Sequence, residues 1–517
     1  MNSHLVEWYS RGFWLATFSL VLWHAVKDKD NWSKLAQFGI VAGITLYAVS
    51  FSFIHLQAGP RLLILSRDFL MMGVISLFFN TIRNLKKFYW LAVIVLYALS
   101  KMGWGKWQAN TLRNAEVSIT KEIKDENEWE LLVQLDDLNA LPDLKPILDQ
   151  YNLGEQISFN LNDKAKTDID NFISIEIPEY NEGKITEIKS ALSRNSHVIW
   201  IEDNETIAVE PIKNVEPYRS PFKPLTNDPY SDQQWSLESQ GWNHIVQMQR
   251  DGILKPTKRA RIFILDSGID GNHEDLKDNY VSLDKKYDTD EVGHGTHVAG
   301  IADAVSNNNI GIASVSPGKE FCSITSIKVL GRFGAGTQRD VINGILKAAD
   351  EGADVINLSL GGRSLDAHQK AFDEAVSYAN GKGAIIVAAA GNDNADATNY
   401  SPANVRNVIA VSAIDQSNHK ASFSNSVEQI KYKIAAPGFA IFSCMPGNQY
   451  SALNGTSMAA PFVTGLIGLM KSIKPDLDTK EAYRIIDATG KESLDDQLTG
   501  KVIVAEKAIK MCLDRVN

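Results

Sequence analysis

The chain of 517 residues has little cysteine, only Cys322, Cys444 and Cys512, and these lie far apart in the sequence. No two of them have CxxC spacing, so the sequence indicates neither a thiolate zinc site nor a framework of disulfide bonds. Proline is also sparse, with 16 residues in all, yet five of these fall within 211–230. Because proline fixes its own backbone and disfavours helix in the residue before it, we predict an extended linker over 211–230.

An excess of positive charge occurs only at the N-terminal end. Residues 1–113 carry 12 Lys and Arg and 4 Asp and Glu, whereas the whole chain has a formal net charge of −10. The remaining residues are therefore strongly acidic. Binding of nucleic acid requires clustered Lys and Arg to neutralise the phosphates, so we expect no nucleic acid partner. The length of the chain predicts two or three domains.

Four apolar runs mark the N-terminal region, at 12–26, 35–59, 69–82 and 88–100. The second is long enough to span a lipid bilayer, and the others are short. Seven of the 11 tryptophans lie in residues 1–110, several at the ends of runs, as in the aromatic belts of membrane proteins. A signal peptide followed by core helices is the alternative, but a signal peptide has a single apolar region. We predict about four transmembrane helices within 1–110.

The side of the membrane on which the rest of the chain lies is open. Four spans would place six Lys and Arg of the first 113 residues on each side, so the positive-inside rule gives no orientation. The absence of paired cysteines favours the cytoplasm slightly. We therefore expect a multi-pass membrane protein, with a slight preference for a cytoplasmic soluble part.

The middle of the chain reads as a small separate domain. Residues 111–126 are polar and charged and are interpreted as a linker. From 127 to 210 the sequence alternates between strand-like and helix-like patterns, which gives a β-α-β-α-β order. The segments are WELLVQL (129–135), LPDLKPILDQYNL (141–153), FISIEI (172–177), KITEIKSALSRN (184–195) and HVIWIED (197–203). We predict a small α+β domain over 127–210.

Three segments of the last 280 residues carry polar side chains that core packing does not explain. Asp266 ends the apolar run of RIFILDSGIDG (261–271), His294 lies in GHGTHVAGIA (293–302), and Ser457 precedes an apolar helix in NGTSMAAP (454–461). A serine hydroxyl becomes a good nucleophile when a base removes its proton and a carboxylate holds that base. Singly, these residues could be a strand-end cap, a loop histidine and a helix N-cap. Together and in this order, they predict an Asp-His-Ser triad.

These motifs, with VINLSLGG (355–362) and VAAAGN (387–392), resemble the subtilisin-like serine proteases, or subtilases, over 231–511. The resemblance implies a parallel-sheet α/β domain over 231–517 and an endopeptidase that forms an acyl-enzyme. It assigns Asp266 to orienting the base, His294 to the base, Ser457 to the nucleophile and the Asn392 amide to the oxyanion. Ala459 stands where the esterase motif G-x-S-x-G has its second glycine, which disfavours an esterase.

The same resemblance implies a groove for polypeptide substrates and a structural calcium ion. The groove would be formed by one edge at Ser359, Leu360 and Gly361, a facing edge at Gly334, and a pocket at Ala389, Ala390 and Gly391. Calcium would be held by the Asp275 carboxylate, the Asn308 side chain and carbonyls near Ile310 and Ile312, all of them oxygen ligands. The alternative for these last residues is a plain turn. The chemistry itself requires no cofactor.

Residues 127–210 resemble the inhibitor-type propeptide of subtilases, because HVIWIEDNETIAVE (197–210) is similar to the end of that module. NDPYSDQQW (227–235) resembles the start of a mature enzyme. The resemblance implies a zymogen whose own propeptide domain is a partner and which cuts itself within the linker 211–230. The favoured function is thus a membrane-tethered, self-processed serine endopeptidase. The alternative is a membrane sensor or signalling protein whose protease domain acts once on itself or on one dedicated partner.

Overall fold

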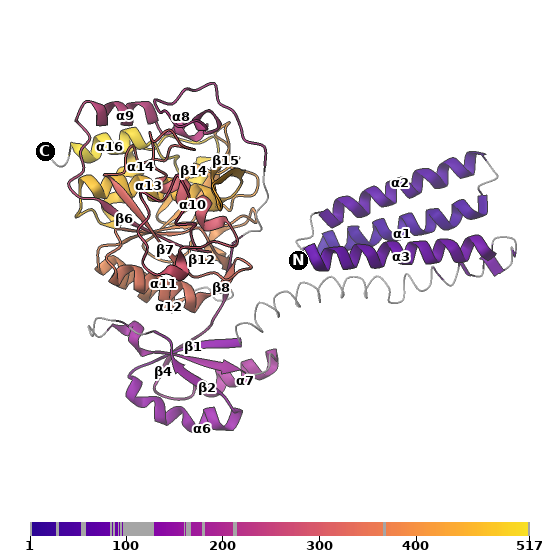
Figure 1. Ribbon diagram of the computed structural model, residues 1–517. Helices are drawn as coiled ribbons and strands as arrows, with labels where there is room; N and C mark the ends of the chain where they lie inside the picture. Colours follow the sequence, from indigo (N-terminus) through magenta and orange to yellow (C-terminus); the bar gives the residue numbers. More distant parts are fainter. Residues whose placement is uncertain are drawn as a thin grey trace. The chain divides into compact units, whose positions relative to one another are not determined.

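The computed structural model describes residues 3–26, 30–52, 58–82, 129–159, 161, 167–177, 181–209, 215–364 and 369–514, with isolated positions between 85 and 96. The contacts divide the chain into two units, 1–126 and 127–517 (Figure 1). The predicted linker 111–126 and the run 88–100 fall wholly or largely outside the described residues.

The N-terminal unit contains three long helices, α1 (Ser3–Val26), α2 (Asp30–Ser52) and α3 (Ala58–Ile82). Helices α1 and α2 pack closely, because Gly39 and Gly43 of α2 face Ser19 and Ala16 of α1. A Cβ atom on Gly43 would lie 2.7 Å from Ala16 Cα, well inside van der Waals contact. Small residues at four-residue spacing allow this close approach of two helices.

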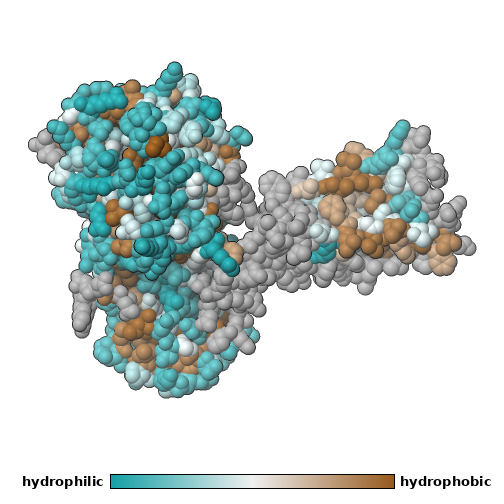
Figure 2. All heavy atoms as spheres, in the orientation of Figure 1, coloured by the Kyte–Doolittle hydropathy of each residue, from teal (hydrophilic) through white to brown (hydrophobic). Residues whose placement is uncertain are grey.

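The four predicted transmembrane helices are not confirmed. Among the described residues, one helix is long and apolar enough to cross a membrane, and it is α13 (Thr456–Ile473), the fully buried core helix of the second unit. Phe13–Val26 of α1 is apolar but shorter. Arg67 and Asp68 fall inside α3, and the part of that helix after them is apolar. The helices nevertheless expose many large apolar side chains (Figure 2).

The small domain at the start of the second unit has a four-stranded antiparallel sheet in the order β2-β3-β1-β4. Its elements are β1 (Trp129–Leu135), α6 (Leu141–Tyr151), β2 (Gly154–Ile157), β3 (Phe172–Ile177), α7 (Glu182–Leu192) and β4 (Val198–Asp203). Alternate side chains of β1 lie on opposite faces of the sheet. Leu131 and Val133 pack with the helices of the small domain, whereas Leu132 packs with the larger domain. The sequence interpretation missed β2, a short and largely exposed edge strand without an apolar pattern.

The larger domain is built on a six-stranded parallel sheet in the order β14-β13-β11-β9-β6-β7. The strands are β6 (Ala260–Asp266), β7 (Cys322–Lys328), β9 (Val355–Leu358), β11 (Ile385–Ala389), β13 (Val408–Ile414) and β14 (Lys433–Pro437). Helices cover both faces, so alternate residues of β6 are buried on opposite sides: Ile262 and Ile264 on one, Phe263 and Leu265 on the other. This confirms the predicted parallel-sheet α/β domain.

One face of the sheet packs against α10 and α13, and the other against α11 and α12. The helices are α8 (Ser236–Ser239), α9 (Trp242–Arg250), α10 (His294–Asp303), α11 (Gln338–Asp350), α12 (Lys370–Gly381), α13, α14 (Thr479–Thr489), α15 (Asp496–Thr499) and α16 (Ala505–Leu513). The short strands are β5 (Thr206–Ala208), β8 (Ala335–Thr337), β10 (Gly362–Arg363), β12 (Tyr400–Ser401), β15 (Ile441–Met445) and β16 (Gln449–Leu453).

Candidate active site

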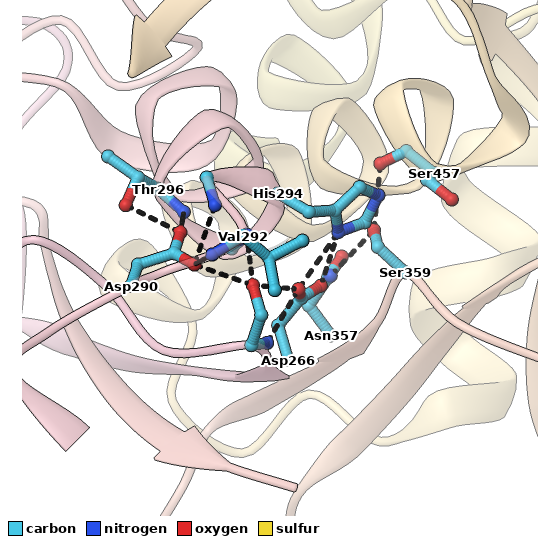
Figure 3. A network of polar contacts seen from close by, with 11 residues as sticks. Asp266, Asp290, Val292, His294, Thr296, Asn357, Ser359 and Ser457 are labelled. Atoms are coloured by element: carbon cyan, nitrogen blue, oxygen red, sulfur yellow. Dashed lines mark hydrogen bonds and ion pairs between the residues drawn. The ribbon is translucent and has the colours of Figure 1, made fainter. Parts of the chain in front are cut away.

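The predicted triad residues meet at the carboxyl-end edge of the sheet. Asp266 is the last residue of β6, His294 is the first of α10, and Ser457 is the second of α13. His294 Nδ1 lies 2.8 and 3.0 Å from the two carboxylate oxygens of Asp266, and both side chains are buried (Figure 3). A second hydrogen bond, 2.7 Å from the Ser267 amide to Asp266 Oδ1, fixes the carboxylate.

The Asp266 carboxylate sets both the tautomer and the basicity of His294. Nδ1 donates to the carboxylate, which leaves Nε2 to accept a proton. Burial lowers the pKa of His294, but the charge and the hydrogen bond of Asp266, with a smaller contribution from Asp290, raise it above its usual value overall. A buried imidazole beside a carboxylate is suited to act as a general base.

A glycine allows α10 to start directly against the end of β6. Gly295, the second residue of the helix, faces the Gly268 carbonyl, and a Cβ atom there would lie 3.1 Å from Asp266 Cβ. Any larger residue would push the helix away from the strand. His294 would then lose its contact with Asp266, so the motif HGT has a packing reason as well as a chemical one.

Ser457 is held from behind by a chain of buried polar groups. Thr464 Oγ1 donates to Asn357 Oδ1 (2.8 Å), Asn357 Nδ2 to Ser359 Oγ (2.9 Å), and Ser359 Oγ to the Ser457 carbonyl (2.8 Å). Figure 3 shows Ser359 joined to Asn357 on one side and to Ser457 on the other. Among the described residues no hydrogen bond joins the Ser457 hydroxyl to His294, and in enzymes without substrate this bond is often long.

The Asn392 side chain is oriented by the residue before the serine. Its Oδ1 accepts from the Thr456 amide (2.8 Å) and from Thr456 Oγ1 (2.9 Å). The Nδ2 group is therefore left to donate to a group next to Ser457. Asn392, Thr456 and Ser457 line the same cavity of about 150 Å³. The N-terminus of α13 adds backbone amides and a favourable dipole for a developing negative charge.

The predicted groove residues separate into those that line this cavity and those that support it. Leu360, Gly361, Ala389 and Gly391 line it. Ser359 is fully buried, and its hydroxyl donates to the Ser457 carbonyl. Ala390 lies behind the cavity in a separate apolar cluster.

Comparison with known proteins agrees with this geometry. The family model described as Subtilase family matches residues 257–500. Thermitase of Thermoactinomyces vulgaris is 42% identical over 252 residues, which make up 48% of this chain and 85% of thermitase. The chain belongs to the subtilase family. The predicted enzyme class, a serine endopeptidase of the subtilase type, is thereby confirmed.

Other relatives of this subtilase cover the same part of the chain. Subtilisin DY of Bacillus licheniformis is 38% identical over 256 residues, which cover 48% of the chain and 90% of the relative. A thermophilic serine proteinase of Bacillus sp. strain AK1 is 37% identical over 295 residues, covering 56% and 67%. The solved structure of a protease from Pseudoalteromonas arctica covers 56% of the subtilase and 99% of its own chain at 27% identity, with a TM-score of 0.49.

A segment of the subtilase chain itself lies in the groove. Ala208 exchanges two backbone hydrogen bonds with Gly361 (3.0 and 3.1 Å), and the Val209 amide donates to the Gly334 carbonyl (2.9 Å). Ala208 and Val209 also line the cavity that contains Ser457. The segment 206–209 is thus an extended strand between two edges of the larger domain. Residues 210–214 lie outside the described residues, and the Val215 amide then donates to the Ala452 carbonyl (3.0 Å).

The small domain is anchored at the N-termini of α11 and α12. The Glu202 carboxylate accepts from the Lys370 amide (2.8 Å) and from Gln338 Nε2 (2.7 Å), while Arg339 Nη1 binds Glu130 Oε1 (2.7 Å). Burial raises the pKa of Glu202 to about 7, although its hydrogen bonds act in the opposite direction. These buried contacts position the small domain so that its last strand enters the groove.

The residues predicted to hold calcium lie together in one loop region. Asn308 Nδ2 donates to Asp275 Oδ1 (2.8 Å), the Ile312 amide to Asp275 Oδ2 (2.8 Å), and the Ile310 amide to Asn308 Oδ1 (2.7 Å). Burial raises the pKa of Asp275 to about 7, with a further contribution from the charge of Asp228. Within the described part of the chain, no group of three or more His, Cys, Asp or Glu side chains forms a metal site.

The sequence interpretation missed two carboxylates near these sites. Asp228 accepts from the amides of Asn307 (2.8 Å) and Asn308 (3.0 Å) beside the predicted calcium ligands. Asp290 accepts five hydrogen bonds next to the triad. Their positions in the sequence could have drawn attention to them. Asp228 lies in the NDPY motif, and Asp290 comes four residues before His294.

Proposed function

We propose that this subtilase is a membrane-tethered serine endopeptidase. In the intact chain, its groove is occupied by residues 206–209 of the same chain. The observation that carries the proposal is the strand 206–209, which is paired with Gly361 and Gly334 beside Ser457. A polypeptide bound in this way presents its backbone to the nucleophile. Backbone pairing on both edges favours peptides over simple esters as substrates.

The residues of the site supply the steps of acyl transfer. His294 Nε2 takes the proton of Ser457 as the hydroxyl attacks the substrate carbonyl, and Asp266 stabilises the imidazolium that forms. The oxyanion accepts hydrogen bonds from Asn392 Nδ2 and from the backbone at the start of α13. His294 then gives the proton to the departing amine. Water repeats the sequence on the acyl-enzyme and releases the acid.

The small domain 127–210 is the proposed inhibitory partner of the catalytic domain. Its strand fills the groove, and Glu202 and Arg339 hold it in place. Self-cleavage within 211–230 would convert this intramolecular inhibitor into a separate chain. The zymogen proposal therefore rests on the occupied groove and on the proline-rich composition of the linker.

The lipid bilayer is the proposed environment of the N-terminal helices. Monomeric soluble proteins rarely expose large continuous apolar surfaces, and brown apolar side chains cover much of the described helices in Figure 2. The close α1–α2 packing through Gly39 and Gly43 is of a kind common in membranes. The exposed apolar residues include Trp32, Leu35, Phe38, Val41, Phe69, Leu70, Val74 and Leu77.

We place the catalytic domain on the cytoplasmic side. Its three cysteines are free and buried, which fits a reducing compartment. Protease protection of membrane vesicles of known orientation tests this placement. Digestion of the catalytic domain from outside intact cells would contradict it.

Calcium is the proposed structural ion of the loop around Asp275. The carboxylate oxygens of Asp275 and Asp228 suit a hard cation, and neither carboxylate has an ion-pair partner among the described residues. Bound calcium would stabilise the folded state, since it binds that state alone. We expect calcium to raise the thermal midpoint of the wild type but not of Asp275→Asn or Asp228→Asn. An equal rise in all three would contradict the site.

A sensor that cuts only itself is the second candidate function. It is favoured by the occupancy of the groove, since a strand that stayed there after cleavage would block other substrates. A test that separates the two functions compares the wild type with Ser457→Ala by intact mass and membrane fractionation, with and without an added polypeptide substrate. Cleavage of both the linker and the added substrate supports the endopeptidase. Cleavage of the linker alone supports the sensor, and a linker cut equally in Ser457→Ala rules out self-processing.

A further inference from the structure

A second buried carboxylate lies beside the triad, and the acyl-transfer steps give it no role. Asp290, in the loop before α10, is 8% exposed. Its Oδ1 accepts from Ser267 Oγ (2.8 Å) and from the amides of Gly293 (2.8 Å) and Val292 (3.1 Å). Its Oδ2 accepts from the Thr296 amide (2.9 Å) and Thr296 Oγ1 (2.8 Å). Figure 3 shows these contacts beside the pair formed by His294 and Asp266.

Asp290 completes the N-terminus of the helix that carries His294. The N-cap of α10 is Gly293, which has no side chain with which to cap the helix. The amide of Thr296, the third residue of the helix, has no acceptor within α10, and Asp290 supplies one. A carboxylate at this end is also favoured by the helix dipole. Asp290 therefore fixes the first turn of α10, including the backbone of His294.

Asp290 also determines where the Ser267 hydroxyl points. Ser267 Oγ lies 2.8 Å from Asp290 Oδ1 and 3.2 Å from Asp266 Oδ1, and it accepts from the Gly295 amide (3.1 Å). A hydroxyl has a single proton, and the shorter contact assigns that proton to Asp290. The Asp266 oxygens then keep their negative charge for His294 Nδ1.

We infer that Asp290 is a positioning residue: it orients His294 by capping α10, and it accepts the hydrogen bond of the Ser267 hydroxyl, so that the Asp266 carboxylate is left to His294 Nδ1. This inference rests on the proposed use of His294 as the general base. The charged groups that face His294 are Asp266 from β6, Asp290 from the preceding loop and His297 from α10 itself. The two carboxylates raise the pKa of His294 and burial lowers it.

The test is the pH profile of the Asp290→Asn variant on a peptide substrate, measured beside the wild type after the linker of each full-length chain has been cut. The base must be unprotonated to act, so kcat/KM rises as the pH passes through the pKa of His294. Loss of the Asp290 charge lowers that pKa, and we expect the acid limb to move to lower pH. We expect kcat to fall about tenfold to a hundredfold with little change in KM.

Three variants serve as controls. Asp288→Asn removes the same charge two residues away, where the carboxylate binds Tyr280 and Ser282, and it should leave the acid limb in place. Ser267→Ala removes the bridge but keeps the Asp290 charge, so kcat should fall without a shift of the limb. Asp290→Glu keeps the charge and should also keep the limb, and it decides the question should Asp290→Asn fail to fold.

NMR titration of the His294 Nδ1 proton measures the same shift without turnover. A downward shift in Asp290→Asn, absent in Asp288→Asn, supports the inference. A uniform loss of kcat with an unchanged titration would show a purely structural role and overturn it. A wild type that cleaves neither its own linker nor an added peptide would refute the proposed function, whereas the titration would still decide the effect of Asp290 on His294.

Discussion

Single residues around Ser457 divide between those that react and those that hold the reacting groups. Asn392 illustrates the first kind, because Thr456 ties down its carbonyl oxygen and leaves the amide nitrogen at the cavity. Ser359 illustrates the second, since its hydroxyl binds the Ser457 carbonyl from a fully buried position. The two residues should therefore respond differently to mutation: loss of Asn392 affects the transition state, whereas loss of Ser359 affects the placement of the nucleophile.

Replacement of Asn392 by alanine tests the oxyanion role. We expect kcat to fall about 10²–10³-fold with KM nearly unchanged, because the lost hydrogen bond forms only as the oxyanion develops. Asn399→Ala, at an exposed position of the same connection, is the control and should keep wild-type kcat. A fall in KM and kcat together, or an equal effect of both substitutions, would argue against an oxyanion donor at Asn392.

The sequence was sufficient for the residues that lie in compact motifs and insufficient for those whose partners are distant. Asp266, His294, Ser457 and Asn392 each follow from a short segment, and the structure brings them to one edge of the sheet. Asp228 depends on amides 79 and 80 residues further on, and no local pattern reveals such a contact. The hydrogen bond from the Ser359 hydroxyl to the Ser457 carbonyl joins residues 98 apart, and the motif SLGG does not show it.

Among the elements, α2 depends most directly on two small residues. A Cβ atom on Gly43 would lie 2.7 Å from Ala16 Cα, whereas one on Gly73 in α3 would meet nothing within 4 Å. We expect Gly43→Ala to destabilise the N-terminal unit by about 1–3 kcal/mol through overpacking. Gly73→Ala should be neutral or stabilising by up to about 1 kcal/mol, because alanine is the better helix former.

Thermal unfolding of the full chain in detergent measures this contrast. Tryptophan fluorescence reports mainly on the N-terminal unit, which contains seven of the 11 tryptophans. Equal midpoints for the two alanine variants would contradict close α1–α2 packing. A lower midpoint for Gly73→Ala alone would indicate that a partner covers the open side of α3.

Element boundaries were predictable where the apolar pattern was strong. The strand WELLVQL and the helix that begins with LPD appear as β1 and α6, close to the expected positions. The edge strand β2 was missed, because GEQI has no alternating apolar residues to reveal it. The strand order β14-β13-β11-β9-β6-β7 is set by long crossovers, so local sequence patterns could not predict it.

In the molecule as a whole, Glu202 makes the association of the small and catalytic domains depend on pH. Burial in the complex raises its pKa from the ordinary 4.5 to about 7. The complex thus binds more protons than the separated domains between these values, and association weakens as the pH rises from 4.5 to 7. After the linker is cut by an added protease, we expect more small domain to co-elute with the catalytic domain at about pH 5 than at about pH 8. Glu202→Gln should remove this difference, and its persistence would contradict the assignment.

Self-processing depends on which bond of the segment after Val209 can react. Val209 lines the cavity of Ser457, and the next two residues in the sequence are Glu210 and Pro211. A proline nitrogen is part of a ring and carries no hydrogen, and the ring crowds the residue before it. Cleavage between Glu210 and Pro211 would require His294 to protonate that hindered nitrogen.

The intact chain should therefore be a poor substrate for itself at this bond, and Pro211→Ala should be cut faster. We expect at least about a tenfold gain in the rate of linker cleavage, since about 1.4 kcal/mol of relieved crowding corresponds to a factor of ten. Intact mass over time measures the rate and locates the bond, and Pro217→Ala is the matched control. Equal rates in the wild type and in Pro211→Ala would mean that the chain is cut elsewhere, and Ser457→Ala would then show whether that cut is its own.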